Sequence, residues 1–287
     1  MSETATAELP RDFDGLRTII LAQRERLPKR IAQIAAYALD NPDEIAFGTA
    51  ASIAVSAGVQ PSTLIRFAQH LGFDGFTSLQ GVFRERLRER NSTYEERLNT
   101  LRGGEGTSEG NHRILDGFLT ASRKSLDVMS RTLDEGALDR AIATLAEAET
   151  IYILARRRSY PIASYLAYAL GKLGVRNQLV ESAAGLDPEI IAFASPKDAA
   201  IVISFSPYAP ATIEDAGGLA ERGVPVVAIT DSAFSPLASV AQAWFEVAEA
   251  DFGGFRTLTA TMTLAMTLAV GVGEARRAGR RRRRSRE

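Results

Sequence analysis

The segment at residues 49–71 constrains the fold of this chain more than any other part of its sequence. It reads TAASIAVSAGVQPSTLIRFAQHL, in which a glycine separates two stretches of helical character. Ala54 is small where two helices must cross closely, and Gly58 can take the positive φ of a tight turn. Pro61 can open a helix because that position needs no backbone N–H. The pattern predicts a helix-turn-helix.

The second of these helices has one apolar face and several polar ones. Leu64, Phe67 and Leu71 recur at helical spacing and should face the core. The other faces carry side chains of the kind that contact base edges and phosphates in DNA complexes. We therefore expect DNA contacts from Gln60, Ser62, Thr63, Arg66 and Gln69. We also expect a contact from Thr49, at the start of the motif. The alternative for this segment alone is a compact helical domain without a nucleic-acid role.

The flanks of this motif supply the rest of a small helical domain. Residues 27–39 repeat apolar side chains three and four apart, and residues 78–90 predict a further helix after a turn at residues 72–76. Positions 1–90 hold eleven basic and eleven acidic residues, so no general basic surface is present. Any DNA contact must come from local clusters, such as the arginines at positions 84, 86, 88 and 90.

The composition excludes several classes of site. A chain of 287 residues suggests two domains, and its 45% hydrophobic content supports folded cores. It has no cysteine and two histidines, so we expect no disulfide, no thiol nucleophile and no Cys/His metal site. We also expect no cofactor. The N-terminus does not resemble a signal peptide and no apolar stretch is long enough to span a bilayer. We therefore expect a cytoplasmic protein without a membrane partner.

Changes in composition divide the chain. Residues 91–110 end in the polar, glycine-rich string RGGEGTSEG, which predicts a linker between a domain at residues 1–90 and another at residues 111–278. Residues 279–287 form a basic tail. Residues 276–287 carry a net charge of +7, and because the whole chain carries −1, the remaining residues carry −8. The tail is either a solvated, disordered end or a non-specific contact to DNA phosphates.

Beyond residue 150 the pattern alternates between strands and helices. Such alternation implies right-handed crossovers and a parallel sheet covered by helices on both faces. Helices are expected at residues 113–132, 134–147, 161–173, 211–222 and 258–278, and strands at residues 151–154, 176–180, 200–204, 224–230 and 244–247. The fold class is therefore an all-α N-terminal helix-turn-helix domain followed by an α/β domain.

Three hydroxyl-rich loops follow these strands, at residues 155–160, 204–210 and 230–236. In parallel sheets, ligands bind beyond the carboxyl ends of the strands, where helix N-termini present free N–H groups. Hydroxyls near such N–H groups suit a phosphate or a sugar, although serines are also ordinary helix caps. We expect such a ligand to contact Arg157, Ser159, Ser204, Ser206 and Thr230.

These features together resemble the MurR/RpiR family of bacterial transcription regulators. Residues 58–76, GVQPSTLIRFAQHLGFDGF, are similar to the family's helix-turn-helix. The strings ISFSPY at residues 203–208, GVPVVAITDS at residues 223–232 and SPLA at residues 235–238 resemble the sugar isomerase (SIS) domain. The resemblance implies an SIS fold for the second domain, a phosphosugar or related metabolite as effector, a double-stranded DNA operator as partner, and a homodimer or homotetramer.

The sequence departs from the family in its ligand loops. The first SIS loop of the family normally runs Gly-x-Gly-x-Ser, whereas residues 155–159 here read ARRRS. The second loop usually has Ser-Gly-x-Thr or Ser, whereas residues 206–209 here read SPYA. Without these glycines the backbone cannot approach a phosphate as closely. The forked guanidinium group of arginine can instead bind a phosphate or a carboxylate. We therefore expect a phosphosugar or an acidic sugar as effector, and the alternative is that the three arginines form only a solvated loop. The sequence does not distinguish Arg157 from Arg156 or Arg158 as the charge partner.

The expected function is a DNA-binding transcription regulator without enzyme activity, repressing genes of carbohydrate catabolism or transport. The main alternative is an SIS-fold sugar-phosphate isomerase, which needs a general base near the sugar. No histidine lies on an expected SIS loop, and Glu181 and Glu214 are the remaining candidate bases. A further alternative is a DNA-binding scaffold that has lost its effector.

Overall fold

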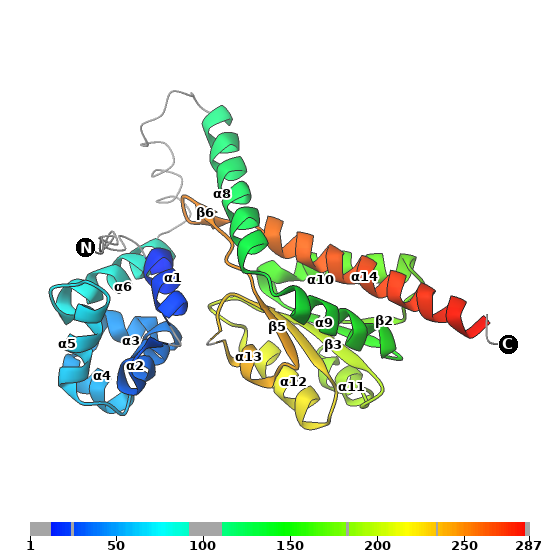
Figure 1. Ribbon diagram of the computed structural model, residues 1–287, viewed down its shortest axis with the longest axis horizontal. Coiled ribbons are helices and arrows are strands. Elements are labelled where there is room, and N and C mark those ends of the chain that lie inside the picture. Colours follow the sequence, from blue (N-terminus) through cyan, green and yellow to red (C-terminus); the bar gives the residue numbers. More distant parts are fainter. Residues whose placement is uncertain (1–12, 24–25, 92–110, 182–183, 234, 285–287) are drawn as a thin grey trace, which may run out of the picture. The chain divides into compact units, whose positions relative to one another are not determined.

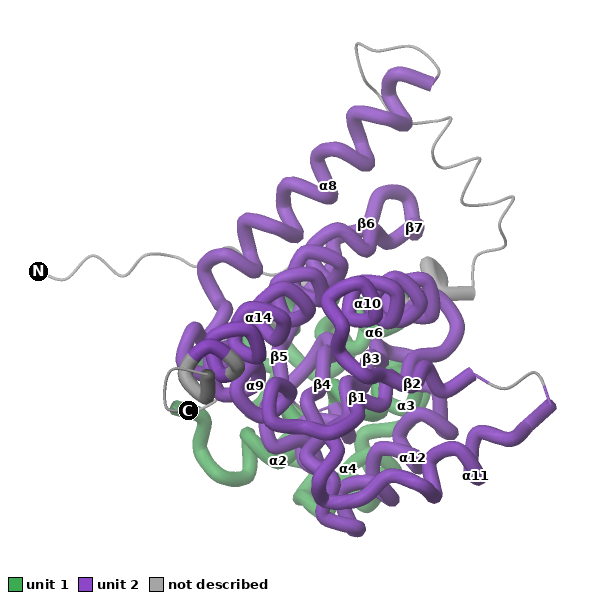
Figure 2. Tube along the Cα trace, turned by 90° about the vertical axis from the view of Figure 1, so that its right-hand side faces the viewer, with its two compact units in different colours: residues 1–105 green, residues 106–287 purple. Residues whose placement is uncertain are grey.

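The computed structural model describes residues 13–23, 26–91, 111–181, 184–233 and 235–284 (Figure 1). The chain divides into two compact units, residues 1–105 and residues 106–287 (Figure 2). The linker expected at residues 91–110 lies outside the described residues, apart from position 91. None of the helices in the described ranges is long and apolar enough to cross a membrane.

The first unit is a bundle of short helices. These are α1 (Phe13–Gln23), α2 (Lys29–Asp40), α3 (Pro42–Phe47), α4 (Ala50–Ser56), α5 (Pro61–His70) and α6 (Phe76–Asn91). Ile34, Ile53 and Phe67 are fully buried in its core. The all-α prediction is confirmed. Pro42 begins α3, because a first helical turn needs no proline N–H.

Helices α4 and α5 meet at a turn that depends on glycine. Gly58 has a φ of +64°. The side chain of Gln33 in α2 holds this turn, since its Nε2 donates to the carbonyl oxygen of Ala57 at 2.9 Å. Thr49 and Ser52 cap the start of α4 reciprocally, each hydroxyl accepting the other residue's backbone N–H at 3.1 Å or less. The helix-turn-helix geometry therefore comes from local chemistry at both ends of α4.

The second unit contains a five-stranded parallel sheet of order β2-β1-β3-β4-β5. Its strands are β1 (Ile151–Ala155), β2 (Asn177–Val180), β3 (Ala199–Ile203), β4 (Val226–Thr230) and β5 (Ala243–Glu246). Each lies within two residues of its predicted bounds. A small antiparallel hairpin, β6 (Asp251–Phe252) with β7 (Phe255–Arg256), was not predicted.

Helices cover both faces of this sheet (Figure 1). One face packs on α9 (Glu135–Glu147), α10 (Tyr160–Lys172) and α14 (Thr259–Arg284). The other packs on α11 (Asp187–Ala192), α12 (Pro210–Glu221) and α13 (Pro236–Val240). Successive strand residues alternate between the two cores, for example Ile153 and Leu154 in β1. A further helix, α8 (Asn111–Thr132), precedes α9. The predicted parallel sheet flanked by helices is confirmed.

Helix α14 is longer than the sequence pattern predicts. Its start is capped by Glu249, whose Oε1 accepts the backbone N–H of Thr261 at 2.8 Å. It then runs through the expected end at residue 278 to Arg284, so residues 279–284 of the expected tail are helical. Arginine is a strong helix former, and basic residues near a helix C-terminus interact favourably with its dipole. Residues 285–287 lie outside the described ranges.

The turn at Gly58 generates a stability prediction. In Gly58→Ala, the added methyl group would be strained by the positive φ and would approach Gln33 Nε2 to 3.3 Å. We expect the first unit to lose about 1–2 kcal/mol, which corresponds to an increase of roughly 5- to 30-fold in amide exchange of α4 and α5. Gly75→Ala is the control, because a methyl group there meets nothing within 4 Å. Equal exchange in the two variants, measured by mass spectrometry, would contradict the assigned role of Gly58.

Candidate functional sites

Helix α5 presents a polar face beside its buried one. Ser62, Arg66 and Gln69 are exposed and follow one another at helical spacings of four and three. Thr63 is half-buried, and Gln60 is exposed at the N-cap position without making a side-chain cap hydrogen bond. The expected DNA-contacting residues of α5 thus lie mostly on an accessible surface. Thr49 differs from them, because its hydroxyl caps α4.

One apolar residue interrupts this polar face. Ile65 is 48% exposed although it lies between core positions in the sequence. An exposed aliphatic side chain beside arginine and glutamine can contact the methyl group of thymine. Sequence reasoning missed Ile65, because an isoleucine in an amphipathic helix is ordinarily expected in the core.

In the second unit, the strand order places a crevice between β1 and β3. The chain leaves β1 in one direction to form β2 and then returns past it to form β3. Ligands of doubly wound sheets bind at such a switch point, beyond the carboxyl ends of the strands. The loop after β1 contains a 3₁₀ turn (Arg157–Ser159), and the loop after β3 runs from Ser204 to the start of α12 at Pro210.

A cavity of about 210 Å³ occupies this place, and we call it the β1–β3 cavity. Its lining combines hydroxyl and guanidinium groups with an aromatic ring, and consists of Arg156, Arg157, Arg158, Ser159, Ser204, Phe205, Ser206, Pro207 and Ala209. The structure thus brings together four of the five expected effector residues. It offers hydrogen-bond donors and positive charge to an anionic, hydroxylated ligand.

Thr230, the fifth expected residue, does not line this cavity. Its side chain is fully buried at the end of β4, and its hydroxyl lies 2.7 Å from the Ser235 hydroxyl. Ser235 in turn caps α13 by accepting the backbone N–H of Leu237. The hydroxyls of this third loop therefore satisfy one another and a helix end, which is the ordinary capping role of such residues.

The three arginines of the first loop have different surroundings. Arg156 forms ion pairs with Asp187 at 3.0 Å and Asp215 at 2.8 Å, and also donates to the Thr212 hydroxyl. The side chains of Arg156 and of its two aspartate partners are each at most 25% exposed. Two carboxylates neutralise this guanidinium, so Arg156 joins the loop to α11 and α12. Sequence reasoning missed both aspartates, because nothing in the local pattern links them to the loop.

Arg158 is held in another way. Its guanidinium lies 5.5 Å from the centre of the Phe205 ring, within cation–π distance. Desolvation lowers the pKa of Arg158 to about 10, and the like charge of Arg256 contributes, while Asp231 and Glu249 oppose the change. Arg158 remains protonated at neutral pH. Asp231 itself accepts hydrogen bonds from the Ser206 N–H and the Tyr208 hydroxyl, which fixes the loop after β3.

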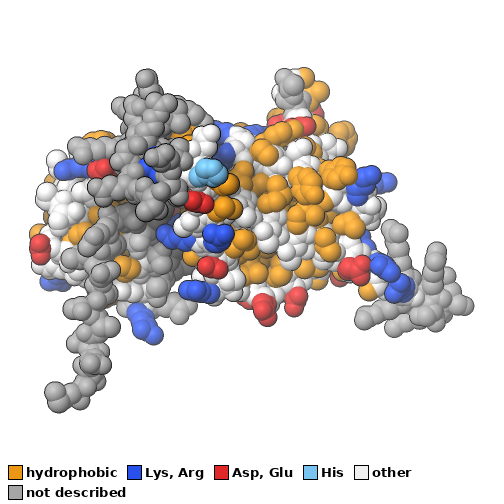
Figure 3. All heavy atoms as spheres, turned by 90° about the horizontal axis from the view of Figure 1, so that it is seen from above, with side chains coloured by type: hydrophobic (Ala, Val, Ile, Leu, Met, Phe, Trp, Pro, Cys, Tyr) orange, Lys and Arg blue, Asp and Glu red, His pale blue; other side chains and the backbone are white. Residues whose placement is uncertain are grey.

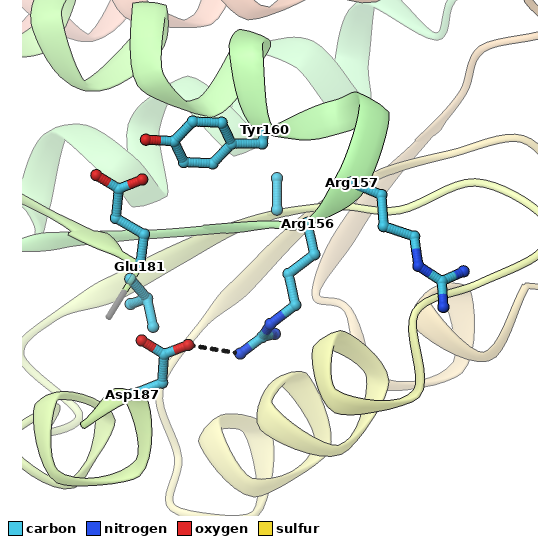
Figure 4. Close-up of a pocket in the computed structure, with 7 residues that line it drawn as sticks. Arg156, Arg157, Tyr160, Glu181 and Asp187 are labelled. Carbon is cyan, nitrogen blue, oxygen red and sulfur yellow. Dashed lines mark hydrogen bonds and ion pairs between the residues drawn. The ribbon is translucent and has the colours of Figure 1, made fainter. Parts of the chain in front are cut away.

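A second cavity lies on the other side of β1, and we call it the β1–β2 cavity (Figure 4). It measures about 460 Å³ and is lined by Ala155, Arg156, Arg157, Tyr160, Val180, Glu181 and Asp187. Figure 4 shows Arg156 directed toward Asp187, whereas Arg157 extends away from both Glu181 and Asp187. Arg156 and Arg157 line both cavities.

Comparisons with known sequences agree with this architecture. The profile described as "Helix-turn-helix domain, rpiR family" matches residues 14–89, and the SIS domain profile matches residues 144–271. The uncharacterized HTH-type transcriptional regulator YfhH of Escherichia coli K12 is 27% identical over 175 residues. The match covers 61% of this chain and 60% of YfhH, so it spans less than two thirds of that relative.

Solved structures with the same fold include two regulators. The Vibrio vulnificus NanR protein complexed with ManNAc-6P is 20% identical, with a TM-score of 0.53 over 91% of this chain and 90% of that one. The sugar isomerase domain of an RpiR transcription factor from Sphaerobacter thermophilus is 23% identical, with a TM-score of 0.53 over 59% of this chain and 96% of that one. At these identities the likeness concerns the fold alone. Both profiles are matched in the order that the sequence predicts, so the chain combines a helix-turn-helix domain of the RpiR family with an SIS domain.

Proposed function

We propose that the protein is a transcription regulator that binds DNA through residues 1–90 and senses a metabolite through residues 111–278. The observation that carries this proposal is the β1–β3 cavity, where hydroxyls and guanidinium groups meet at the switch point of the sheet. A chain with an exposed, polar recognition helix and such a cavity has the two sites that metabolite-controlled DNA binding requires. We further propose that it represses genes of carbohydrate catabolism or transport.

The chemistry of the cavity defines the effector class. Serine hydroxyls suit a polyol, and an arginine fork suits the oxygens of a phosphate or a carboxylate. A phosphosugar or an acidic sugar carries both kinds of group. The ManNAc-6P bound by Vibrio vulnificus NanR belongs to the first of these classes, which is consistent with the proposal.

An uncharged surface supports a homo-oligomer. Residues 160–171 of α10 and 259–273 of α14 contain no charged side chain, although 24% of the chain is charged. Tyr165, Tyr168 and Val270 are each about half exposed on these helices. Figure 3 shows hydrophobic side chains gathered over this side of the domain. Depletion of charge with exposed aromatics is typical of subunit interfaces, and we propose that a second copy covers this face.

An isomerase is the competing function for an SIS fold. Its reaction needs a general base within hydrogen-bond reach of the sugar. The described lining of the β1–β3 cavity contains no aspartate, glutamate or histidine. Glu181 lines the neighbouring cavity instead, and Glu214 is an exposed residue of α12. This arrangement favours ligand sensing over isomerisation.

The DNA-binding proposal is tested on α5. We expect nuclease footprinting to show two half-sites related by two-fold symmetry, since one recognition helix reads only a few base pairs. Arg66→Ala should weaken operator binding by about 1–3 kcal/mol with a normal circular dichroism spectrum. Arg140→Ala removes an equal charge from an exposed position of the second unit and serves as control. A single protected half-site, or equal operator affinity for Arg66→Ala and wild type, would contradict the proposal.

The effector proposal is tested on the loop after β3. Combining Ser204→Ala with Ser206→Ala removes two hydroxyls from the β1–β3 cavity. We expect normal operator affinity but loss of the response to a stabilising sugar phosphate, which should otherwise be worth about 1–3 kcal/mol of coupling. The control combines Ser130→Ala with Ser239→Ala, both exposed serines of the same unit. If the double variant responds like the wild type, the effector binds elsewhere.

A further inference from the structure

The backbone of Arg157 has an unusual conformation. Its φ is +57°, and among the described residues other than glycine it alone has a positive φ. For a residue with a Cβ atom, the left-handed region is unfavourable because Cβ approaches the following carbonyl oxygen. Such strain persists where the surroundings over-determine it, and it concentrates at ligand sites.

A glycine would avoid this cost. In the Gly-x-Gly-x-Ser pattern that the loop resembles, Arg157 stands at the second glycine, with Ser159 at the serine. Glycine adopts the left-handed conformation as readily as the right-handed one. The loop therefore keeps the backbone shape that suits a glycine while carrying the longest cationic side chain.

Arg157 is also the available cation of its loop. The charge of Arg156 is neutralised by two carboxylates, and Arg158 lies against the Phe205 ring with Asp231 and Glu249 nearby. Arg157 is exposed and lines both cavities, and Figure 4 shows it directed away from Glu181 and Asp187. Within the described parts of the chain, no hydrogen bond or ion pair involves its side chain.

We propose that Arg157 determines effector specificity by binding the ligand's anionic group with its guanidinium fork, and that its strained backbone aims the fork at the β1–β3 cavity. This inference rests on the proposed effector site and names the chemistry within it. Recognition by a side-chain fork favours two oxygens in one plane, as a carboxylate or a phosphate presents them. In this protein a side chain therefore holds the anion. In the family's Gly-x-Gly-x-Ser pattern, by contrast, the backbone can approach the anion closely.

Three substitutions separate the side chain from the backbone. Arg157→Ala removes the fork but keeps a Cβ at positive φ, and Arg157→Gly removes both the fork and the strain. Arg157→Lys keeps the charge without the fork. Thermal unfolding should place the Tm of Arg157→Gly about 2–4 °C above that of Arg157→Ala. The probes for binding, by calorimetry on the full chain, are glucose 6-phosphate, gluconate and 6-phosphogluconate.

We expect Ala and Gly at this position to weaken binding of a probe that the wild type recognises by about 10- to 100-fold, and Lys to weaken it less. The probe that loses affinity tells whether the fork holds phosphate or carboxylate. Equal Tm values for the Gly and Ala variants would overturn the inference that the backbone at Arg157 is strained. Wild-type affinity in Arg157→Ala would overturn the inference that its guanidinium contacts the anion. If none of the three probes binds the wild type, the effector part of the proposed function is contradicted and this inference fails with it, whereas the DNA-binding part is judged by footprinting.

Discussion

The loop after β1, which lines the β1–β3 cavity, is held in place by the ion-pair cluster around Arg156. One guanidinium joins the loop after β1 to Asp187 at the start of α11 and to Asp215 and Thr212 in α12. The cluster holds one positive and two negative charges, so loss of Arg156 would leave two carboxylates without a cation and would be costly. The three elements are therefore held together. This cluster fixes the loop that carries Arg157 and Arg158 at the mouth of the β1–β3 cavity.

The cluster also explains how a loop without glycines can line the β1–β3 cavity, where we propose that the effector binds. A glycine-rich loop lets backbone N–H groups approach an anion closely, whereas the loop here extends side chains. Arg156 anchors it, Arg157 has no side-chain hydrogen bond or ion pair among the described residues, and Arg158 lies over the Phe205 ring. The three residues are the same amino acid and differ in their partners and in the positive φ of Arg157. The division of roles follows from charge compensation and packing.

Sequence reasoning identified the fold because the relevant signals are local. Gly58, Pro61 and the apolar spacing of α5 specify the helix-turn-helix, and short apolar runs separated by helices specify the parallel sheet. The carboxylate partners of Arg156 lie 31 and 59 residues away in helices of ordinary composition, so no local pattern reveals them. Thr230 shows the converse difficulty. Its loop resembles the other two in composition, but its hydroxyl turns into the core toward Ser235.

A structure of the full chain with a bound anionic sugar tests the account most directly, because the account depends on where the effector sits. Crystals grown with the tightest-binding sugar phosphate or acidic sugar should show the ligand in the β1–β3 cavity. Its hydroxyls should lie within hydrogen-bond distance of Ser204 or Ser206, and its anionic group should contact the Arg157 guanidinium. A ligand bound outside this cavity, or one bound there without contact to Arg157, would contradict the account.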